Sequence, residues 1–209
     1  NLKLLELLNL NFQNDETELF PYPDDYHYAK ELLLPFSEKK IVAIAPGSVW
    51  QTKRWPLEYY KVLVRKLIDV GIAIVFIGSK KERKDCEELI EGLSLEAINI
   101  CGETGIRRSA AVIALCDLMI CNDSGSLHIA NAVKTDVFAF FGPTVSEIGY
   151  FPYRPYDRIF QVDLKCRPCG SHGGKFCPLR HHLCMKKIKP ELVFQAAYEY
   201  LQVSDNNEI

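Results

Sequence analysis

Short apolar runs alternate with longer amphipathic segments from residue 41 onward. Residues 41–45 are all apolar and predict a buried strand. Apolar residues then recur three or four positions apart, which predicts a helix over 56–70, with Pro56 in its first turn and Gly71 at its end. The same alternation predicts further strands at 72–77, 97–100, 117–121, 136–141 and 158–162, and helices at 80–91, 107–116, 125–133 and 190–201.

This alternation of apolar strands and helices is typical of a parallel sheet with helices on both faces. We therefore expect a doubly wound, Rossmann-like α/β domain over residues 38–203. Residues 1–37 mix leucine-rich and acidic pieces with prolines, so they predict a connector outside the core, and residues 204–209 predict a polar tail.

Composition narrows the class of protein. The chain has 25 Lys and Arg against 27 Asp and Glu, a net charge of −2, and a pI of about 6.2, which argues against a nucleic-acid partner. No apolar run approaches the roughly 20 residues of a membrane-spanning helix. The chain starts without Met or a secretory signal, so we expect a piece of a longer cytoplasmic protein.

Two loops at the expected carboxyl edge of the sheet carry candidate ligand-binding groups. The first follows the strand at 41–45 and contains the Ser48 hydroxyl and the adjacent cations Lys53 and Arg54, a combination suited to a phosphate. A solvated loop with Trp55 as a packing anchor is the alternative. The sequence leaves both interpretations open.

The second loop is a sharp strand-to-helix passage over residues 121–128. Ser124 or Ser126 can cap the helix, and Gly125 allows a ligand to approach the backbone N–H groups of its first turn. The charge of Asp123 would repel a phosphate, so we expect it to accept from a hydroxyl. His128 points to the same corner, although a capping or core role for it stays open.

Other nucleotide and hydrolase motifs are absent from the sequence. No G-x-G-x-x-G follows the first strand, and neither a G-x-x-x-x-G-K-[ST] loop nor a G-x-S-x-G elbow occurs. These absences weaken the dehydrogenase, P-loop and serine-hydrolase interpretations.

Five motifs in order resemble glycosyltransferase family 9, the heptosyltransferases of lipopolysaccharide core synthesis. They are A-P-G-S with K-R-W-P near residues 45–56, F-I-G-S at 76–79 with Glu82 following, N-D-S-G-x-x-H-I-A-N-A at 122–132, F-G-P-T at 141–144, and a cysteine run at 166–184 similar to the heptosyltransferase II branch.

The resemblance implies a GT-B enzyme built from two Rossmann-like domains. This chain would be the C-terminal domain that binds ADP-heptose, and residues 1–37 would be a connector or a remnant of the N-terminal domain that holds the lipid A–inner core acceptor. Ser48 and Lys53 match phosphate-binding positions, and Glu82 matches an acid near the nucleoside. Asp123, Ser124, Gly125 and His128 match the D-[TS]-G-x-x-H signature, whereas Val49 replaces a hydroxyl found in the family.

The mechanism that the resemblance implies is an inverting displacement without a cofactor or a protein-bound metal. A base in the N-terminal domain would deprotonate the acceptor, and Lys53 would stabilise the leaving diphosphate. The chain alone should bind the donor without transferring sugar, in the cytoplasm or at the cytoplasmic face of the inner membrane. Two alternatives stay open: a GT-B sugar-nucleotide enzyme with another donor, and a non-catalytic nucleotide-binding module.

Eight cysteines fall into two groups. Cys86, Cys101, Cys116 and Cys121 lie in apolar segments and predict reduced core residues. Cys166, Cys169, Cys177 and Cys184 lie in a polar loop with one C-x2-C pair, for which structural zinc, a disulfide and free thiols all stay open. We expect free thiols, because the spacing supplies only one such pair. The basic residues around this loop can face acceptor phosphates or anionic lipid headgroups, or simply solvent.

Overall fold

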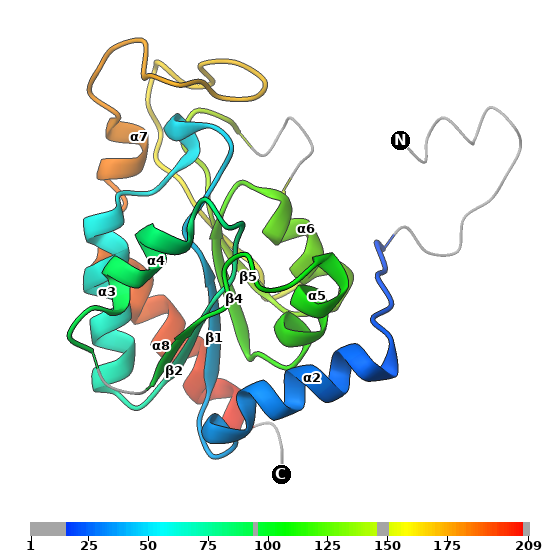
Figure 1. Ribbon diagram of the computed structural model, residues 1–209. Helices are drawn as coiled ribbons and strands as arrows, with labels where there is room; N and C mark the ends of the chain where they lie inside the picture. Colours follow the sequence, from blue (N-terminus) through cyan, green and yellow to red (C-terminus); the bar gives the residue numbers. More distant parts are fainter. Residues whose placement is uncertain (1–15, 94–95, 146–150, 207–209) are drawn as a thin grey trace, which may run out of the picture.

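The core of the molecule is one parallel sheet (Figure 1). The computed structural model describes residues 16–93, 96–145 and 151–206, and within them six strands pair in the order β3-β2-β1-β4-β5-β6. The expected parallel α/β sheet is confirmed. The strands are β1 (Ile41–Ala45), β2 (Ala73–Phe76), β3 (Ala97–Asn99), β4 (Leu118–Asn122), β5 (Val137–Phe140) and β6 (Arg158–Phe160).

Helices cover both faces of the sheet because the side chains of each strand alternate between the two faces. Val42 and Ile44 of β1 pack with one group of helices: α3 (Leu57–Asp69), α4 (Arg83–Ile90) and α8 (Pro190–Asn206). Ala43 and Ala45 pack with the other group: α2 (Pro23–Leu33), α5 (Ile106–Ala114) and α6 (Gly125–Ala132). Short helical turns lie at η1 (Leu34–Phe36), η2 (Gln51–Lys53) and α7 (Leu183–Lys186).

The expectation that residues 1–37 lie outside the core is wrong for the segment 23–36. This segment forms α2 and η1, and α2 packs against α5 (Figure 1). Ala29, Leu33 and Phe36 are buried in the core. These apolar residues recur three or four apart, but nearby prolines hid the period, and Pro23 in fact begins the helix. Residues 1–15 lie outside the described residues.

The other expected elements are confirmed, with bounds that shift by a few residues. Two differences are larger: α7 was not expected, and α8 continues to Asn206 instead of ending at residue 201. Within the described residues, no helix is both long and apolar enough to cross a membrane.

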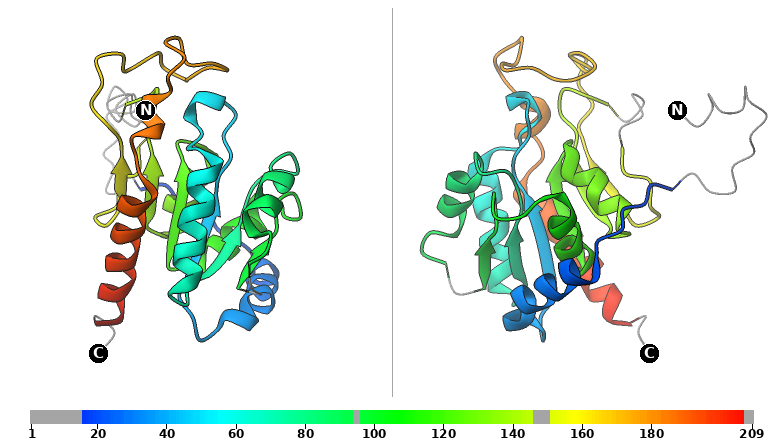
Figure 2. Two further views of the ribbon diagram at one scale, coloured as in Figure 1. Left: turned by 90° about the vertical axis from the view of Figure 1, so that its left-hand side faces the viewer. Right: turned by 45° about the vertical axis from the view of Figure 1, so that its right-hand side comes forward.

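The order of the strands reverses direction at β1, which pairs with β2 on one side and β4 on the other. In doubly wound sheets this reversal leaves a crevice beyond the carboxyl ends of the strands, where ligands bind. The loops that follow β1 and β4 meet there. The segment 161–182, between β6 and α7, stands above the same edge in both views of Figure 2, and Gly174 in it accepts hydrogen bonds from Thr52 of the β1–α3 loop.

Candidate functional site

The buried side chain of Asn122 connects the end of β4 to the β1–α3 loop by hydrogen bonds. The Asn122 Oδ1 atom accepts from the Trp55 backbone N–H at 2.9 Å and the Tyr60 hydroxyl at 3.3 Å. Its Nδ2 atom donates to the carbonyls of Pro46 at 2.7 Å and Gly47 at 3.2 Å. Asn122 is fully buried, and these contacts satisfy its amide. They fix where the first candidate loop stands relative to the second.

The sequence motif contained Asn122 but gave it no role. A polar residue that ends an apolar strand was the available signal, because such a side chain must find buried partners. Trp55 is confirmed as a packing anchor: its ring stacks on Phe140 with centroids 4.4 Å apart, and its Nε1–H donates to the Ile188 carbonyl.

Lys53 and Asp123, which come from the two candidate loops, form an ion pair. The Lys53 Nζ atom lies 2.6 Å from Asp123 Oδ2, and the Thr144 hydroxyl donates to the same oxygen at 2.6 Å. The two charged side chains are only 12% and 6% exposed. The pair therefore neutralises the carboxylate whose charge was expected to repel a phosphate. Thr144, from the F-G-P-T motif, is a further residue of this candidate site to which the sequence analysis gave no role.

The turn from β4 into α6 presents a polar atom without a partner. Ser124 stands at the N-cap with an extended backbone, but its side chain makes no capping bond. Capping by Ser124 is therefore wrong, because the hydroxyl does not reach the first-turn N–H groups. Its Oγ atom is buried and has no hydrogen-bond partner among the described residues. Since buried hydroxyls are normally bonded, Ser124 is a candidate residue for binding a ligand.

Gly125 and His128 lie at the start of α6, next to Ser124. A Cβ at Gly125 would meet nothing within 4 Å, so the space beside the first turn of α6 is open. Unpaired N–H groups and the positive end of the helix dipole favour an anion in that space. Burial lowers the pKa of His128, and the Asp123 carboxylate partly opposes this shift. His128 is therefore mainly neutral near pH 7.

Two adjoining cavities lie at this edge. The Lys53 cavity, of about 380 Å³, is lined by Ser48, Lys53, Asp123, Ser124, Gly125 and His128, together with Trp50 and His172. The Glu82 cavity, of about 340 Å³, shares Ser48, Ser124 and Gly125 with it and continues to Glu82 and Ile106. The structure thus brings all seven candidate binding residues to one pair of connected cavities.

Glu82 folds over two glycines at the far end of the Glu82 cavity. Its carboxylate accepts from the Ser79 N–H at 2.6 Å and the Ser79 hydroxyl at 2.8 Å. A Cβ at Gly47 would lie 1.5 Å from Glu82 Oε1, and one at Gly78 would lie 2.9 Å from Oε2. Both glycines are therefore needed for Glu82 to reach this position.

Ser48 makes a weaker contact than its motif suggested. The side chain is buried, and its hydroxyl lies 3.5 Å from the Asp123 carbonyl, at the limit of a hydrogen bond. Because this contact is so long, the hydroxyl can turn toward a ligand in the cavity at little cost.

The two cysteine groups differ in burial. Cys86, Cys101, Cys116 and Cys121 are buried free thiols, as expected. In the second group only Cys184 is buried, and burial raises its pKa to about 11. Cys169, Cys177 and Cys184 line one small cavity of about 70 Å³. Among the described residues, no group of three or more His, Cys, Asp and Glu side chains has an arrangement that could hold a metal ion. The state of these thiols stays a prediction.

Two solved structures share this fold. The structure of E. coli ADP-heptose lipopolysaccharide heptosyltransferase II has a TM-score of 0.74 at 24% identity, over 90% of this chain and 54% of that one. The glycosyl transferase family 9 structure from Veillonella parvula has a TM-score of 0.81 at 20% identity, over 96% of this chain and 58% of that one. At these identities the similarity shows the α/β fold.

Sequence comparison shows the family. Lipooligosaccharide heptosyltransferase 2 of Campylobacter jejuni is 34% identical over 194 residues, which are 84% of this chain and 59% of that protein. Lipopolysaccharide heptosyltransferase 2 of E. coli is 34% identical over 113 residues, 52% of this chain and 32% of that protein. The chain thus spans at most about three fifths of these relatives. The family model for glycosyltransferase family 9 (heptosyltransferase) matches residues 2–179, and the chain belongs to that family.

Proposed function

We propose that this chain forms the donor-binding part of an inverting glycosyltransferase that moves heptose from ADP-heptose to the inner core of lipopolysaccharide. The observation that carries the proposal is the Ser124 hydroxyl at the start of α6, which is buried and has no hydrogen-bond partner among the described residues. Ser124 and Lys53 both line a cavity of about 380 Å³. A diphosphate would supply its missing partner. The sugar and the acceptor are inferred from the names of the relatives.

The Lys53 cavity suits the diphosphate of the donor. The first-turn N–H groups of α6 and the Ser124 hydroxyl would bind phosphate oxygens. Lys53 already stands 2.6 Å from Asp123 and can turn from that carboxylate to a phosphate oxygen with little movement. Asp123, which then keeps the hydroxyl of Thr144, can accept from a sugar hydroxyl.

Leaving-group stabilisation is the catalytic contribution expected of this chain. When the acceptor oxygen attacks the anomeric carbon, the bond to the diphosphate breaks and negative charge grows on the β-phosphate. A fixed cation and a helix N-terminus stabilise that charge more in the transition state than in the ground state. The base is expected from the N-terminal domain, since Asp123 is ion-paired and Glu82 is bonded to Ser79. The transfer as proposed uses no cofactor and no protein-bound metal.

The Glu82 cavity would hold the nucleoside. It joins the Lys53 cavity through Ser48 and Ser124 and ends at the Glu82 carboxylate, so a base and its ribose can extend from the diphosphate. A carboxylate that accepts from an exocyclic amine would favour adenine over uracil at this end. The alternatives remain a GT-B enzyme with another donor and a non-catalytic module. We place the protein in the cytoplasm, at the inner face of the membrane where its acceptor is anchored, and we expect no nucleic-acid partner.

Calorimetric titration of the chain with ADP and with UDP tests the proposal. We expect saturable ADP binding that is tighter than UDP binding, lost on Lys53→Ala and kept in Lys30→Ala, which removes an exposed lysine on α2. Equal or tighter UDP binding would contradict the donor assignment. In parallel, the chain should transfer no sugar from ADP-heptose by itself, and measurable transfer would contradict the two-domain mechanism.

A further inference from the structure

The backbone carbonyls of the F-G-P-T loop, residues 141–144 after β5, all accept hydrogen bonds from residues 167–169. The Arg167 guanidinium donates to three of them, those of Phe141, Gly142 and Thr144. The Cys169 backbone N–H donates to the fourth, that of Pro143, at 2.9 Å. These four carbonyls lie outside any helix or strand, so residues 167–169 supply the partners that a regular element would otherwise provide.

Arg167 is suited to this role because a guanidinium is planar and presents five N–H donors in a fixed fork. Its two other acceptors, the Val162 carbonyl and Gln161 Oε1, belong to the segment 161–182. The guanidinium thus joins the F-G-P-T loop to that segment. A lysine here would carry the same charge, but its single nitrogen could not span the carbonyls of three loop residues.

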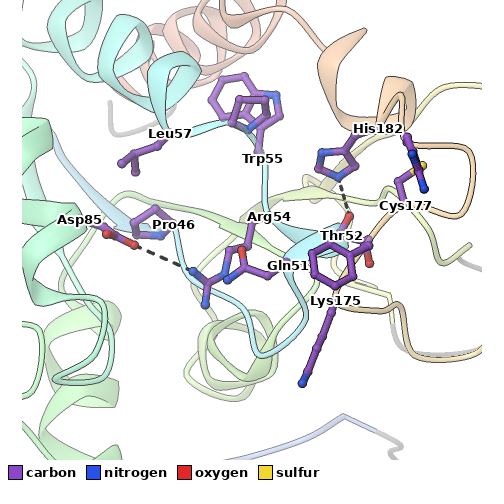
Figure 3. Close-up of a pocket in the computed structure, with 13 residues that line it drawn as sticks. Pro46, Gln51, Thr52, Arg54, Trp55, Leu57, Asp85, Lys175, Cys177 and His182 are labelled. Atoms are coloured by element: carbon purple, nitrogen blue, oxygen red, sulfur yellow. Dashed lines mark hydrogen bonds and ion pairs between the residues drawn. The ribbon is translucent and has the colours of Figure 1, made fainter.

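The same segment is also fixed to the loop that carries Lys53. The Thr52 backbone N–H donates to the Gly174 carbonyl at 3.1 Å, and the Thr52 hydroxyl donates to it at 2.9 Å. On the other side, His182 Nε2 lies 2.8 Å from the Thr52 carbonyl (Figure 3). Because Thr52 directly precedes Lys53, the segment 161–182 holds the backbone beside the cation that pairs with Asp123.

The two loops that the segment holds bring their side chains to one oxygen of Asp123. Lys53 Nζ and the Thr144 hydroxyl each lie 2.6 Å from Asp123 Oδ2. Thr144 is only 3% exposed, so little water can compete for its bond. If Lys53 turns to a phosphate, Thr144 still holds the carboxylate in place. Thr144 depends in turn on Arg167, which binds its carbonyl at 2.8 Å.

We propose that Arg167 is a positioning residue of the donor site, which holds the F-G-P-T loop so that the Thr144 hydroxyl stays on Asp123. Arg167 does not occur among the described residues that line the Lys53 and Glu82 cavities, so it acts through Thr144. That the held carboxylate then accepts from a sugar hydroxyl rests on the proposed function. The positioning itself does not, and it can be tested without a ligand.

The first test uses the ligand-free chain with ¹³C-labelled aspartate. The carboxyl signal of Asp123 is identified by its absence from Asp123→Asn. Arg167→Lys and Thr144→Val should both shift this signal, because both lose the Thr144 hydrogen bond, and the double variant should shift it no further. Thr144→Ser keeps a hydroxyl and should leave the signal in place, as should the control Arg180→Lys, at an exposed arginine of the same segment.

Either single variant can overturn the proposal. A signal that Arg167→Lys leaves unmoved would show that Arg167 does not act on Asp123. A signal that the milder change Thr144→Val leaves unmoved would show the same, even if Arg167→Lys failed to fold.

The second test measures the binding of ADP and ADP-heptose to the same variants by calorimetry. Arg167→Lys and Thr144→Val should each weaken ADP-heptose about tenfold but ADP less than about twofold, because the misplaced carboxylate loses only the sugar. A general loosening of the fold would weaken both ligands alike. The double variant should lose no more than the larger single loss, since both changes remove one contact. Equal losses for the two ligands, or additive losses, would overturn the proposal.

The two tests separate failure of this inference from failure of the proposed function. If Arg167→Lys shifts the Asp123 signal but the native chain binds ADP-heptose no tighter than ADP, the positioning holds and the proposed sugar contact fails. If the native chain prefers ADP-heptose and Arg167→Lys keeps both that preference and the signal, the positioning alone fails.

Discussion

Asn122 and Ser124 lie two residues apart at the end of β4, yet their polar atoms have opposite surroundings. The Asn122 amide is fully buried and makes four hydrogen bonds, three that join β4 to the β1–α3 loop and one with Tyr60 of α3. The Ser124 hydroxyl is also buried but has no hydrogen-bond partner among the described residues, and other atoms of Ser124 line a cavity. The comparison separates a set of hydrogen bonds that holds the fold together from the position where we propose that a ligand binds. Substitution of Asn122 should therefore lower the free energy of unfolding, whereas substitution of Ser124 should lower the affinity for ADP.

Loss of the Asn122 hydrogen bonds should have the largest effect on stability. Asn122→Ala leaves the Trp55 N–H, the Tyr60 hydroxyl and two carbonyls without their partner, so we expect the free energy of unfolding to fall by about 3–5 kcal/mol. Urea denaturation followed by circular dichroism measures it. Asn99→Ala, at a partly buried asparagine of β3 with two hydrogen bonds, should cost only about 1 kcal/mol. If Asn122→Ala lowers the free energy of unfolding by less than about 1 kcal/mol, Asn122 does not hold the fold together as we describe.

Lys53 lines the same cavity as Ser124, where we propose that the donor binds. In an enzyme that contains this chain and transfers sugar, Lys53→Ala should lower kcat by about 10²–10³-fold, because a fixed charge that stabilises the leaving diphosphate is lost. Steady-state kinetics measures the change. Arg65→Ala, at an exposed cation on α3, is the matched control and should leave kcat unchanged. An unaltered rate in folded Lys53→Ala would make Lys53 a structural partner of Asp123 only.

Ser124→Ala should separate binding from folding most clearly. Within the part of the chain that the structure describes, the hydroxyl makes no hydrogen bond. The free energy of unfolding should therefore change by less than about 0.5 kcal/mol, while ADP affinity falls about 5–10-fold. Thr135→Val should show the reverse pattern, since its buried hydroxyl donates to the Ile113 carbonyl at 2.8 Å and does not line the donor cavities. Calorimetry and urea denaturation on both variants give the comparison. A Ser124→Ala protein that is destabilised but binds normally would reverse our assignment.

The smallest expected effect is a pH dependence at His128. Burial lowers its pKa in the folded chain, so the unfolded chain binds the proton first and stability decreases as the pH falls below the ordinary histidine value of about 6.5. A bound diphosphate favours the protonated ring, so ADP binding should take up protons in the same range. The ratio of ADP affinities of the native chain and His128→Gln should therefore rise a few-fold between pH 7.5 and 6. A constant ratio would remove His128 from the site.

The sequence indicated the residues of the proposed donor site, but it did not indicate the hydrogen bonds of Asn122. Periodicity placed the strands and most helices, because apolar spacing directly reflects burial in a layered α/β fold. The loop sequences indicated Lys53 and Ser124, because phosphate binding favours a cation and a helix N-terminus, and the family resemblance added Glu82 as an acid near the nucleoside. The sequence could not show that Asp123 is neutralised by Lys53 and Thr144, since that contact joins segments about 70 and 20 residues apart.

Two features were not predicted from the local sequence. Helix α2 derives its stability from packing on α5, and tertiary contacts of this kind override the turn signals of nearby prolines. The segment 161–182 has neither a helical nor a strand period, so its contact with Thr52 of the β1–α3 loop was not predicted. Asn122 and the β4–α6 part of the proposed donor site, in contrast, both lie in one motif at the end of β4.

The most direct test of the central claim is the structure of this chain with ADP bound. Our account predicts the diphosphate in the Lys53 cavity, with one phosphate oxygen within hydrogen-bond distance of the Ser124 hydroxyl and Lys53 Nζ turned from Asp123 toward the phosphate. The adenine should lie in the Glu82 cavity, and Asn122 should keep all four of its bonds. A diphosphate bound outside the Lys53 cavity, or a Ser124 hydroxyl still without a partner in the complex, would contradict the account.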